Sequence, residues 1–502
     1  MKIALTGASG HMGIATLREF LLIPEVEEVR CLVLPKDKRE KLIKKLARKY
    51  KGRVAIIHGD ISNLPDLEKT CEGVSYLFNL AAVIPPGSDK DPEKSRLANE
   101  VGALNAIKVC ENNSDIKLID ITSVALYGHR TYVRPFERVG DPLMPSVFDA
   151  YAAHKLRGEF AILESDIKNF AIIRQTAMIY YEMLMANKND GLMFHTAFND
   201  PLEWSTAEDS GRLMANIVKE DLLGHLNHDN FWNKIFNLGD KEENRVSGFD
   251  TIQAGFSLMG GGAKTFYGPH YNVTRNFHGG FYLDGDELDK LFHYQNDNFE
   301  EYWKKIGKKY HLGMAKIVPA KLIKKFAIDN CLKDSNAPEY WYKHNDIARL
   351  TAFFGSKEDY ENQPKDWKDF NLIDFKPIRN NSNYVQIDYG FDINKSDKDI
   401  TIEDLKNVAK MHAGKLISDK FTKGDVYAKL EWENQDGERF IARPYSVIRG
   451  GHWMNPLYKD MVWDFDRLSK KDKLYAQYWY DSHKEDEDHC YYFNDKYEAL
   501  MK

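Results

Sequence analysis

The sequence predicts an α/β protein: a Rossmann-type doubly wound parallel sheet with a smaller substrate-binding subdomain and an α+β C-terminal extension. Strand-like and helix-like segments alternate through residues 1–175, as in a parallel sheet that helices cover on both faces. The first strand leads straight into a glycine-rich turn and a helix, the arrangement with which such sheets bind dinucleotides. A chain of 502 residues has room for two or three domains.

Each element of the first region is predicted from its own residue pattern. Short apolar runs rich in β-branched residues indicate strands, and longer runs with an apolar face indicate helices. The strands are expected at residues 3–6, 29–34, 54–57, 76–80, 118–121 and 170–174. The helices are expected at residues 12–22, 39–50, 96–111 and 151–165. Bound cofactor would then lie across the carboxyl ends of the strands.

The glycine-rich turn has the sequence Thr6-Gly7-Ala8-Ser9-Gly10-His11-Met12-Gly13. Glycines three residues apart let the backbone come close to a pyrophosphate, whose charge then sits at the helix N-terminus. A glycine triplet alone is a weak signal, but here it follows a strand and opens a helix. The cofactor-binding residues predicted in this turn are Gly7, Ser9, Gly10, His11, Met12 and Gly13.

Three later residues predict the chemistry. Tyr151 and Lys155 are four residues apart, so on a helix they share a face. A nearby ammonium favours the phenolate, so we expect the pKa of Tyr151 to fall from its usual value of about 10 toward working pH. Tyr151 would then serve as general acid or base for a carbonyl–alcohol interconversion, and Ser123 would hold the substrate oxygen. Together with the glycine turn, this predicts a nicotinamide-dependent enzyme.

The same Tyr-x-x-x-Lys spacing occurs twice more, at Tyr480/Lys484 and Tyr492/Lys496. Neither pair has a strand-borne serine upstream or a glycine turn. Because a motif needs its structural context as well as its letters, only the first pair is predicted to be catalytic.

These pieces together resemble the extended short-chain dehydrogenase/reductases, a group that includes nucleotide-sugar epimerases and dehydratases. The resemblance covers about residues 1–300. Its matching pieces are the glycine turn, Gly59-Asp60-Ile61, Asn79-Leu80-Ala81-Ala82, Asn99-x-x-Gly102, Thr122-Ser123-x-x-x-Tyr127-Gly128, Tyr151-x-x-x-Lys155, Arg174 and Trp204-Ser205-Thr206-Ala207-Glu208-Asp209.

The resemblance implies roles for several of these residues. Lys155 would bind the nicotinamide ribose as well as tune Tyr151. Asp60 and Ile61 would contact the adenine, and Asn99 would support the active-site helix as part of the catalytic set. Ala81 would lie along the dinucleotide, with Leu80 and Ala82 beside it as cofactor-binding residues. The resemblance also implies a homodimer that pairs through the helix carrying Tyr151 and the helix before it.

The end of the second strand bears on the choice between NADP and NAD. Proteins that bind NAD usually place an acid there, about twenty residues after the glycines. This chain has Leu34-Pro35-Lys36-Asp37-Lys38-Arg39 instead. Its basic side chains, Lys36 among them, could pair with a 2′-phosphate, or could simply begin a charged, solvated helix. The sequence favours NADP, while Asp37 keeps NAD open.

The segment after the sixth predicted strand bears on the substrate. Nucleotide-sugar members of the family usually have an Arg-Pro-x-Asn-Val-Tyr-Gly-Pro-like run there. Here the run reads Arg174-Gln175-Thr176-Ala177-Met178-Ile179-Tyr180-Tyr181, and the region beyond it is rich in Met and aromatic residues. Such side chains suit a flat or lipophilic ligand, although they equally suit an ordinary core. We therefore expect a hydrophobic small-molecule substrate.

The rest of the chain is divided by composition. Residues 1–327 form the expected catalytic domain, with the Rossmann core at about 1–175 and the substrate part at about 176–327. Residues 328–395 are expected to be an aromatic-rich helical segment and linker, and residues 396–502 a small α+β domain. That domain faintly resembles a zinc ribbon in which Asn434, Met454 and Leu457 replace the thiolates, so no metal is expected. A lid or an oligomer contact is its expected role.

Bulk properties exclude other classes of function. A net charge of −6 argues against a nucleic-acid binder, and no stretch approaches 18 apolar residues, so no membrane contact is expected. The first strand begins at Lys2, and the five scattered cysteines show no CxxC pair, so a reducing, cytoplasmic location is expected.

Three functions remain on these grounds. The first is an NAD(P)-dependent oxidoreductase that interconverts a ketone and a secondary alcohol on a hydrophobic molecule. The second is a nucleotide-sugar epimerase or dehydratase that retains its NAD. The third is a dinucleotide-sensing scaffold without turnover, ranked last because the Tyr151/Lys155 pair is present.

Overall fold

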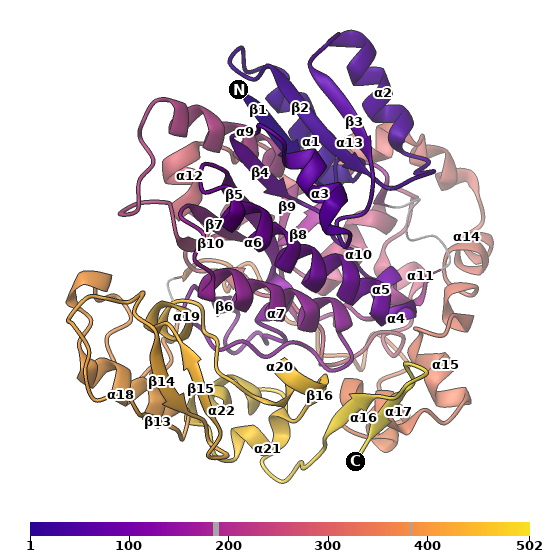
Figure 1. The fold of residues 1–502 in the computed structure, drawn as a ribbon. Helices are drawn as coiled ribbons and strands as arrows, with labels where there is room; N and C mark the ends of the chain where they lie inside the picture. The colour runs from indigo at the N-terminus through magenta and orange to yellow at the C-terminus, as the bar shows by residue number, and fades with distance from the viewer. Residues whose placement is uncertain (184–189, 382–383) are drawn as a thin grey trace.

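A computed structural model describes residues 1–183, 190–381 and 384–502 (Figure 1). Its centre is a seven-stranded sheet in the order β10-β7-β5-β4-β1-β2-β3, with every pair parallel. These strands are β1 (Lys2–Leu5), β2 (Glu28–Val33), β3 (Val54–His58), β4 (Tyr76–Asn79), β5 (Lys117–Ser123), β7 (Phe170–Gln175) and β10 (Lys234–Leu238). The predicted fold class is confirmed, and the six expected strands lie within two residues of their predicted bounds.

Helices cover both faces of this sheet. One face carries α1 (His11–Phe20), α2 (Glu40–Lys49), α9 (Ala207–Leu222) and α12 (Glu287–Phe292), and the other carries α3 (Leu64–Cys71), α6 (Gly102–Asn112) and α7 (Ala150–Glu164). The helix expected at residues 96–111 is built from α5 (Pro92–Arg96), the π-helical turn η1 (Leu97–Val101) and α6. Two separate apolar clusters, one on each face, make up the core, as a doubly wound sheet requires.

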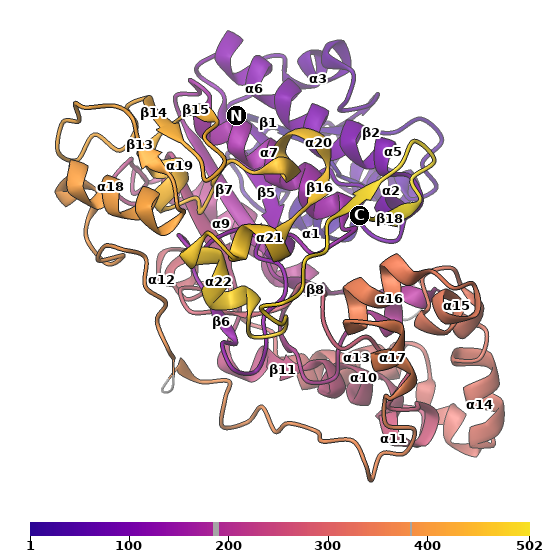
Figure 2. The ribbon, with the colours of Figure 1, turned by 90° about the horizontal axis from the view of Figure 1, so that it is seen from below.

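A second layer of structure stands over the carboxyl ends of the central strands (Figure 2). It contains a small sheet of β8 (Ala177–Ile179), β9 (Pro201–Thr206) and β11 (Arg245–Ser247), and a two-stranded pair of β6 (Phe136–Glu137) and β12 (Phe281–Tyr282). Its helices are α10 (Gly248–Ser257), α11 (Ala263–Phe266), α13 (Phe299–Lys309), α14 (Ala320–Ala327), α15 (Pro338–Lys343), α16 (Ile347–Phe354) and α17 (Lys357–Glu361), with the short turn η3 (Gly191–Phe194). The short helix α4 (Gly87–Lys90) and the turn η2 (Val124–Leu126) lie against α7 instead.

The C-terminal region forms two small sheets with helices between them. The first sheet is β13 (Lys415–Leu416), β14 (Leu430–Glu433) and β15 (Arg439–Ala442), preceded by α18 (Ile402–Met411). The second is β16 (Val462–Trp463), β17 (Tyr491–Phe493) and β18 (Ala499–Met501). Helices α19 (Pro444–Ile448) and α20 (Pro456–Asp460) join the two sheets, and α21 (Phe465–Ser469) and α22 (Lys473–Trp479) follow.

Both α19 and α20 pack against α7 (Figure 1). The Arg157 guanidinium on α7 donates to the carbonyl of Leu457 on α20, with Nη2 at 2.9 Å. The C-terminal region is therefore packed against the helix that carries Tyr151. It also reaches the sheet, because the Ile235 N–H on β10 donates to the Tyr445 hydroxyl and Arg174 on β7 donates to the Gly450 carbonyl. Among residues 1–183, 190–381 and 384–502, no helix is both long enough and apolar enough to cross a bilayer.

Candidate active site

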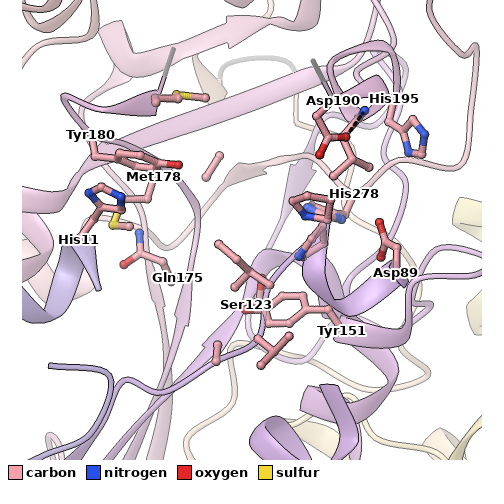
Figure 3. Close-up of a pocket in the computed structure, with 18 of the residues that line it drawn as sticks. His11, Asp89, Ser123, Tyr151, Gln175, Met178, Tyr180, Asp190, His195 and His278 are labelled. Carbon is pink, nitrogen blue, oxygen red and sulfur yellow. Dashed lines mark hydrogen bonds between the residues drawn. The ribbon is translucent and has the colours of Figure 1, made fainter. Parts of the chain in front are cut away.

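A cavity of about 1200 Å³ opens at the carboxyl ends of β1, β4 and β5 and continues beneath the second layer (Figure 3). Of the predicted site residues, the cavity wall contains Gly7, Ser9, Gly10, His11, Met12, Gly13, Asp60, Ile61, Leu80, Ala81, Ala82, Ser123 and Tyr151. Lys36, Asn99 and Lys155 lie outside this wall. Their roles and those of the wall residues stay predictions.

Packing accounts for two glycines of the turn. Gly7 has a φ of +60°, and a Cβ there would lie 2.6 Å from the carbonyl oxygen of Leu80. A Cβ at Gly13 would lie 2.2 Å from the carbonyl oxygen of Gly7. Larger residues would push the turn off β4 or off α1, so the glycines hold the N-terminus of α1 against the cavity. The free N–H groups at that end attract an anion.

Asp37 forms the corner of the cavity next to this turn. Its carboxylate accepts from the Ser9 hydroxyl at 2.5 Å and from the Arg39 backbone N–H at 2.7 Å. The Arg39 guanidinium donates to the Ser9 carbonyl at 2.7 Å, so it is turned toward the glycine turn. Lys36 is exposed, has a φ of +66°, and lies outside the cavity wall.

Asn99 and Lys155 act on the backbone around the cavity. The Asn99 amide bonds both the N–H of Val83, at 3.2 Å, and its carbonyl, at 2.9 Å. The Lys155 ammonium donates to the carbonyl of Ile121 at 2.8 Å and, more weakly, to that of Ala81 at 3.4 Å. Lys155 therefore braces the end of β5, and both side chains brace the loop that leaves β4.

Tyr151 lies on the first turn of α7 and faces Ser123 at the end of β5 (Figure 3). The predicted fall in the pKa of Tyr151 is wrong for this structure. Burial raises the pKa of Tyr151 to about 12, and the hydrogen bond with Ser123 lowers it only in part. The expected effect of Lys155 is missing because its ammonium points at backbone carbonyls rather than at the phenol. A phenol of this kind holds its proton and can give it to a developing alkoxide.

A strap of polar and aromatic contacts joins the glycine turn to the second layer. Tyr180, just after β8, stacks on the ring of His11 with centroids 3.7 Å apart. The Glu182 carboxylate lies 3.3 Å from His11 Nδ1 and 2.9 Å from Lys309 Nζ on α13. This strap of His11, Tyr180, Glu182 and Lys309 ties α13 to the first residue of α1. The sequence contained no signal for it, since its members are up to three hundred residues apart.

The far end of the cavity is acidic. Asp89 on α4, Asp149 before α7 and Asp190 before η3 all line it, together with His195 and His278. In Figure 3, Asp89, Asp190, His195 and His278 lie around the space above the Tyr151 ring. His278 Nδ1 lies 3.2 Å from the Asp149 carboxylate. No local motif links segments so far apart, so the sequence did not predict this group.

Apolar side chains form the rest of the wall, between the acidic end and α13. They are Met178, Met183, Met193, Leu202, Trp204, Ile252, Phe256, Met259, Phe277 and Trp303. Several of them come from the Met- and aromatic-rich region singled out in the sequence. They give the cavity a large apolar area that an extended organic ligand could fill.

Arg174 is held by a fully buried network beneath α7. Its guanidinium pairs with Glu159 at 2.5 Å and donates to the Tyr127 hydroxyl at 2.7 Å and the Gly450 carbonyl at 2.6 Å. Glu159 also accepts from Thr122 at 2.7 Å and lies 3.0 Å from His452 Nε2. Thr122 precedes Ser123 on β5, Arg174 lies on β7, and Glu159 lies on α7. The network therefore joins the C-terminal region to β5, β7 and α7.

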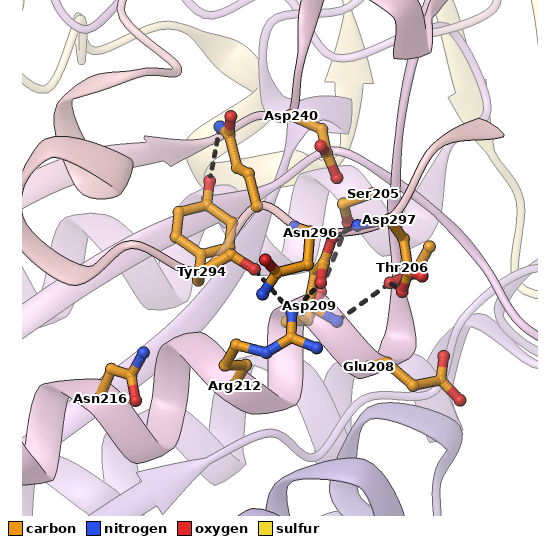
Figure 4. A network of polar contacts seen from close by, with 12 residues as sticks. Ser205, Thr206, Glu208, Asp209, Arg212, Asn216, Asp240, Tyr294, Asn296 and Asp297 are labelled. Carbon is orange, nitrogen blue, oxygen red and sulfur yellow. Dashed lines mark hydrogen bonds and ion pairs between the residues drawn. The ribbon is translucent and has the colours of Figure 1, made fainter.

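The Trp204–Asp209 piece of the resemblance forms a second polar network, at the N-terminus of α9 (Figure 4). The Asp209 carboxylate accepts from the backbone N–H groups of Asn296 and Asp297, at 3.0 and 2.9 Å. Thr206 caps α9 and donates to the Asp297 carboxylate at 2.8 Å. The network fixes the segment before α13 to α9, which positions the helix that bears Lys309.

The N-terminal part of the chain is similar to known proteins. Residues 4–179 match the model of the 3-beta hydroxysteroid dehydrogenase/isomerase family. UDP-glucose 4-epimerases from Rickettsia typhi and Rickettsia akari are 27% and 28% identical over 130 residues, which is 25% of this chain and 37% of theirs. The chain thus spans little more than a third of the length of these curated relatives.

Solved structures show the same fold. A dTDP-glucose 4,6-dehydratase from Streptomyces venezuelae, the DesIV double mutant solved with NAD and DAU bound, has a TM-score of 0.51 and 17% identity. The match covers 62% of this chain and 97% of the dehydratase. The family match over residues 4–179, the parallel sheet and the motifs along its carboxyl edge make this N-terminal part of the chain similar to the extended short-chain dehydrogenase/reductases of the epimerase/dehydratase-like kind, and the chain has an additional C-terminal region.

Proposed function

We propose that this chain is a nicotinamide-dependent enzyme of the epimerase or dehydratase kind, which oxidises a substrate hydroxyl carbon transiently and keeps its dinucleotide bound. One observation carries the proposal: Tyr151 and Ser123 share one cavity with the glycine turn at the N-terminus of α1. The UDP-glucose 4-epimerase names of the curated relatives support the type of reaction. They support the substrate less, since the match spans only 25% of this chain.

The side chains of the cavity would divide the work as follows. Ser123 donates a hydrogen bond to the reacting substrate oxygen. Tyr151 takes the hydroxyl proton when that carbon is oxidised and returns it when the carbonyl is reduced again. The glycine turn would hold a nicotinamide dinucleotide, which would supply hydride acceptance and return. Lys155 fixes the end of β5, and Lys155 and Asn99 fix the loop after β4, so the reacting oxygen stays within reach of the phenol.

The strap supports retention of the dinucleotide. His11 lies at the first position of α1, where a pyrophosphate would sit, and Tyr180 covers its ring. Exchange of a cofactor beneath these residues requires Tyr180 and Glu182 to move away from His11 together. We therefore expect slow release of the dinucleotide.

The test is cofactor content and net turnover in the same preparation. Protein purified without added cofactor should carry close to one dinucleotide per chain, released on denaturation and measured by chromatography. With substrate present, absorbance at 340 nm should show no continuous build-up of reduced cofactor. Empty protein, or continuous stoichiometric reduction of added NAD or NADP, would contradict the retained-cofactor reaction.

The apolar wall favours a second candidate, a net ketone–alcohol oxidoreductase acting on a hydrophobic molecule. The sequence favours this function, but the names of the similar proteins support it less well than they support the epimerase or dehydratase kind. Such an oxidoreductase would use the same residues, but each catalytic cycle would be either an oxidation or a reduction. Continuous reduction of added dinucleotide by secondary alcohols in the experiment above would select it.

We propose NAD as the dinucleotide, against the preference for NADP drawn from the sequence. Asp37 lines the cavity beside Ser9, whereas Lys36 is exposed outside the wall. A carboxylate at this corner accepts hydrogen bonds from ribose hydroxyls and repels a 2′-phosphate. Arg39 already donates to the carbonyl of Ser9, so its guanidinium is engaged there.

Asp37→Asn should therefore change which dinucleotide the purified protein carries. Loss of one charged hydrogen-bond acceptor is worth about 1.5–3 kcal/mol, or roughly 10- to 100-fold in the NAD to NADP ratio. Wild type should release mostly NAD and the variant a mixture, both purified from the same host. Lys36→Ala is the matched control and should leave the ratio unchanged. Mostly NADP in the wild type would overturn this assignment.

We further propose that any pairing of chains uses a surface other than the outer side of α7. The homodimer expected from the resemblance pairs through α7 and the helix before it. Here α19 and α20 pack against α7, and Arg157 is bonded to Leu457 rather than available to a partner. A helix bundle between two copies would have to displace these contacts.

A further inference from the structure

The acidic end of the cavity contains three carboxylates that differ in their hydrogen-bond and ion-pair partners. Asp149 caps α7 through the N–H of Ala152 at 2.9 Å and faces His278. Asp190 accepts from the N–H of Leu192 at 3.0 Å, and Lys90 lies 3.9 Å away. Asp89 accepts from the adjacent Ser88 hydroxyl at 3.2 Å. Within the described ranges, the ion pairs leave Asp89 without a basic partner.

The surroundings of Asp89 make its negative charge costly. Burial is the main cause that raises the pKa of Asp89, to about 7, and the charges of Asp149 and Asp190 add to it. Arg349 acts in the opposite direction, but its guanidinium is paired with Asp346 at 2.5 Å. A cation placed among the three carboxylates would relieve this repulsion, whereas an added anion would increase it.

Two buried polar groups on the same cavity wall lack a partner in the part of the chain that the structure describes. They are Ser146 Oγ, in a residue 6% exposed, and Asn336 Nδ2, in a residue 9% exposed. Ser146 begins the turn that leads to Asp149, whose N–H donates to the Ser146 carbonyl at 3.0 Å. Buried polar groups of this kind are normally satisfied, so both point to a polar ligand.

We propose that the substrate of this site carries a primary ammonium group, bound at the Asp89–Asp149–Asp190 end of the cavity. The ammonium donates to the Asp89 carboxylate and to Ser146 Oγ, and the Asn336 amide donates to an oxygen of the same molecule. The apolar wall holds the body of the substrate. A diphosphate would instead bring two or more negative charges to three carboxylates. The inference rests on the proposed function only for the place where substrate binds.

The test compares two probes of equal chain length, n-hexylamine and n-hexanol, by calorimetric titration of the purified holo-protein. Hexylamine should bind at least roughly tenfold more tightly, the usual value of a charged hydrogen bond. Asp89→Asn keeps the shape of the side chain and should bring the two affinities to within about twofold of each other. Asp115→Asn, an exposed acid remote from the cavity, is the matched control and should keep the full preference.

Equal binding of the two probes to wild type, or an unchanged preference in Asp89→Asn, would overturn the inference. Tighter binding of UDP than of hexylamine would do the same and would select an anionic substrate. If Asp89→Asn fails to fold, the wild-type comparison still decides. Tyr151→Phe should keep the amine preference, so loss of turnover with retained preference tests the two proposals separately.

Discussion

Tyr151→Phe should lower turnover by about 10²- to 10⁴-fold, the usual share of a general acid or base. The hydroxyl of Tyr151 is the group that the mechanism asks to move a proton, and phenylalanine keeps its ring against the cavity wall. Dinucleotide content per chain should stay within about twofold of wild type, since the glycine turn and the strap are untouched. Steady-state rates and released cofactor, measured on the same protein, give both values.

Turnover should also depend on pH in a direction set by Tyr151. Burial raises its pKa to about 12, so the phenolate is scarce at neutral pH. As long as the pH is below the pKa, the phenolate fraction increases about tenfold for each unit by which the pH increases. The oxidation step needs the phenolate, and its rate should therefore climb from pH 7 to pH 9.5 without a plateau. Tyr151→Phe should lose this slope along with the rate.

Tyr480→Phe is the matched control, because Tyr480 and Lys484 repeat the Tyr-x-x-x-Lys spacing outside the cavity wall. It should leave turnover and its pH dependence as in wild type. Unchanged turnover in Tyr151→Phe, or an equal loss in both variants, would remove Tyr151 from the chemistry.

The sequence predicted well those elements whose residue pattern lies within one short, contiguous stretch. The strand–turn–helix at residues 2–20 needs only its own glycines and apolar runs, and the structure has β1, the turn and α1 there. The central sheet was predicted from six such runs. β10 was missed because its five residues, Lys234–Leu238, lie in an irregular region and become a strand only by pairing with β7.

Side-chain direction was harder to predict than position. Tyr151 and Lys155 do lie on one helix, but spacing could not show that the ammonium would bond the Ile121 and Ala81 carbonyls. Asp89, Asp190 and His278 could not be associated at all, since tertiary folding alone brings their segments together. The same holds for His452, which reaches Glu159 across 293 residues of sequence.

The largest stability effect is expected at Arg174. It is fully buried, and Arg174→Met would leave Glu159 as a buried carboxylate short of its main counter-charge. Breaking a buried pair from one side costs about 3–5 kcal/mol. The midpoint of urea unfolding should fall accordingly. Arg439→Met, which breaks the exposed pair with Glu431 at 3.2 Å, should cost less than about 0.5 kcal/mol.

The pH dependence of this effect identifies its source. Burial alone would raise the pKa of Glu159, but Arg174 and His452 hold it at about 2. A depressed carboxyl pKa contributes stability above the unfolded value, near 4.3, and loses it as pH falls toward 2. The difference in free energy of unfolding between wild type and Arg174→Met should therefore have its full size at pH 7 and become smaller below pH 4. If this difference stays constant down to pH 2, then lost packing, rather than loss of the ion pair, destabilises the variant. Because Arg174 also donates to the Gly450 carbonyl, the variant should in addition loosen the C-terminal region from α7.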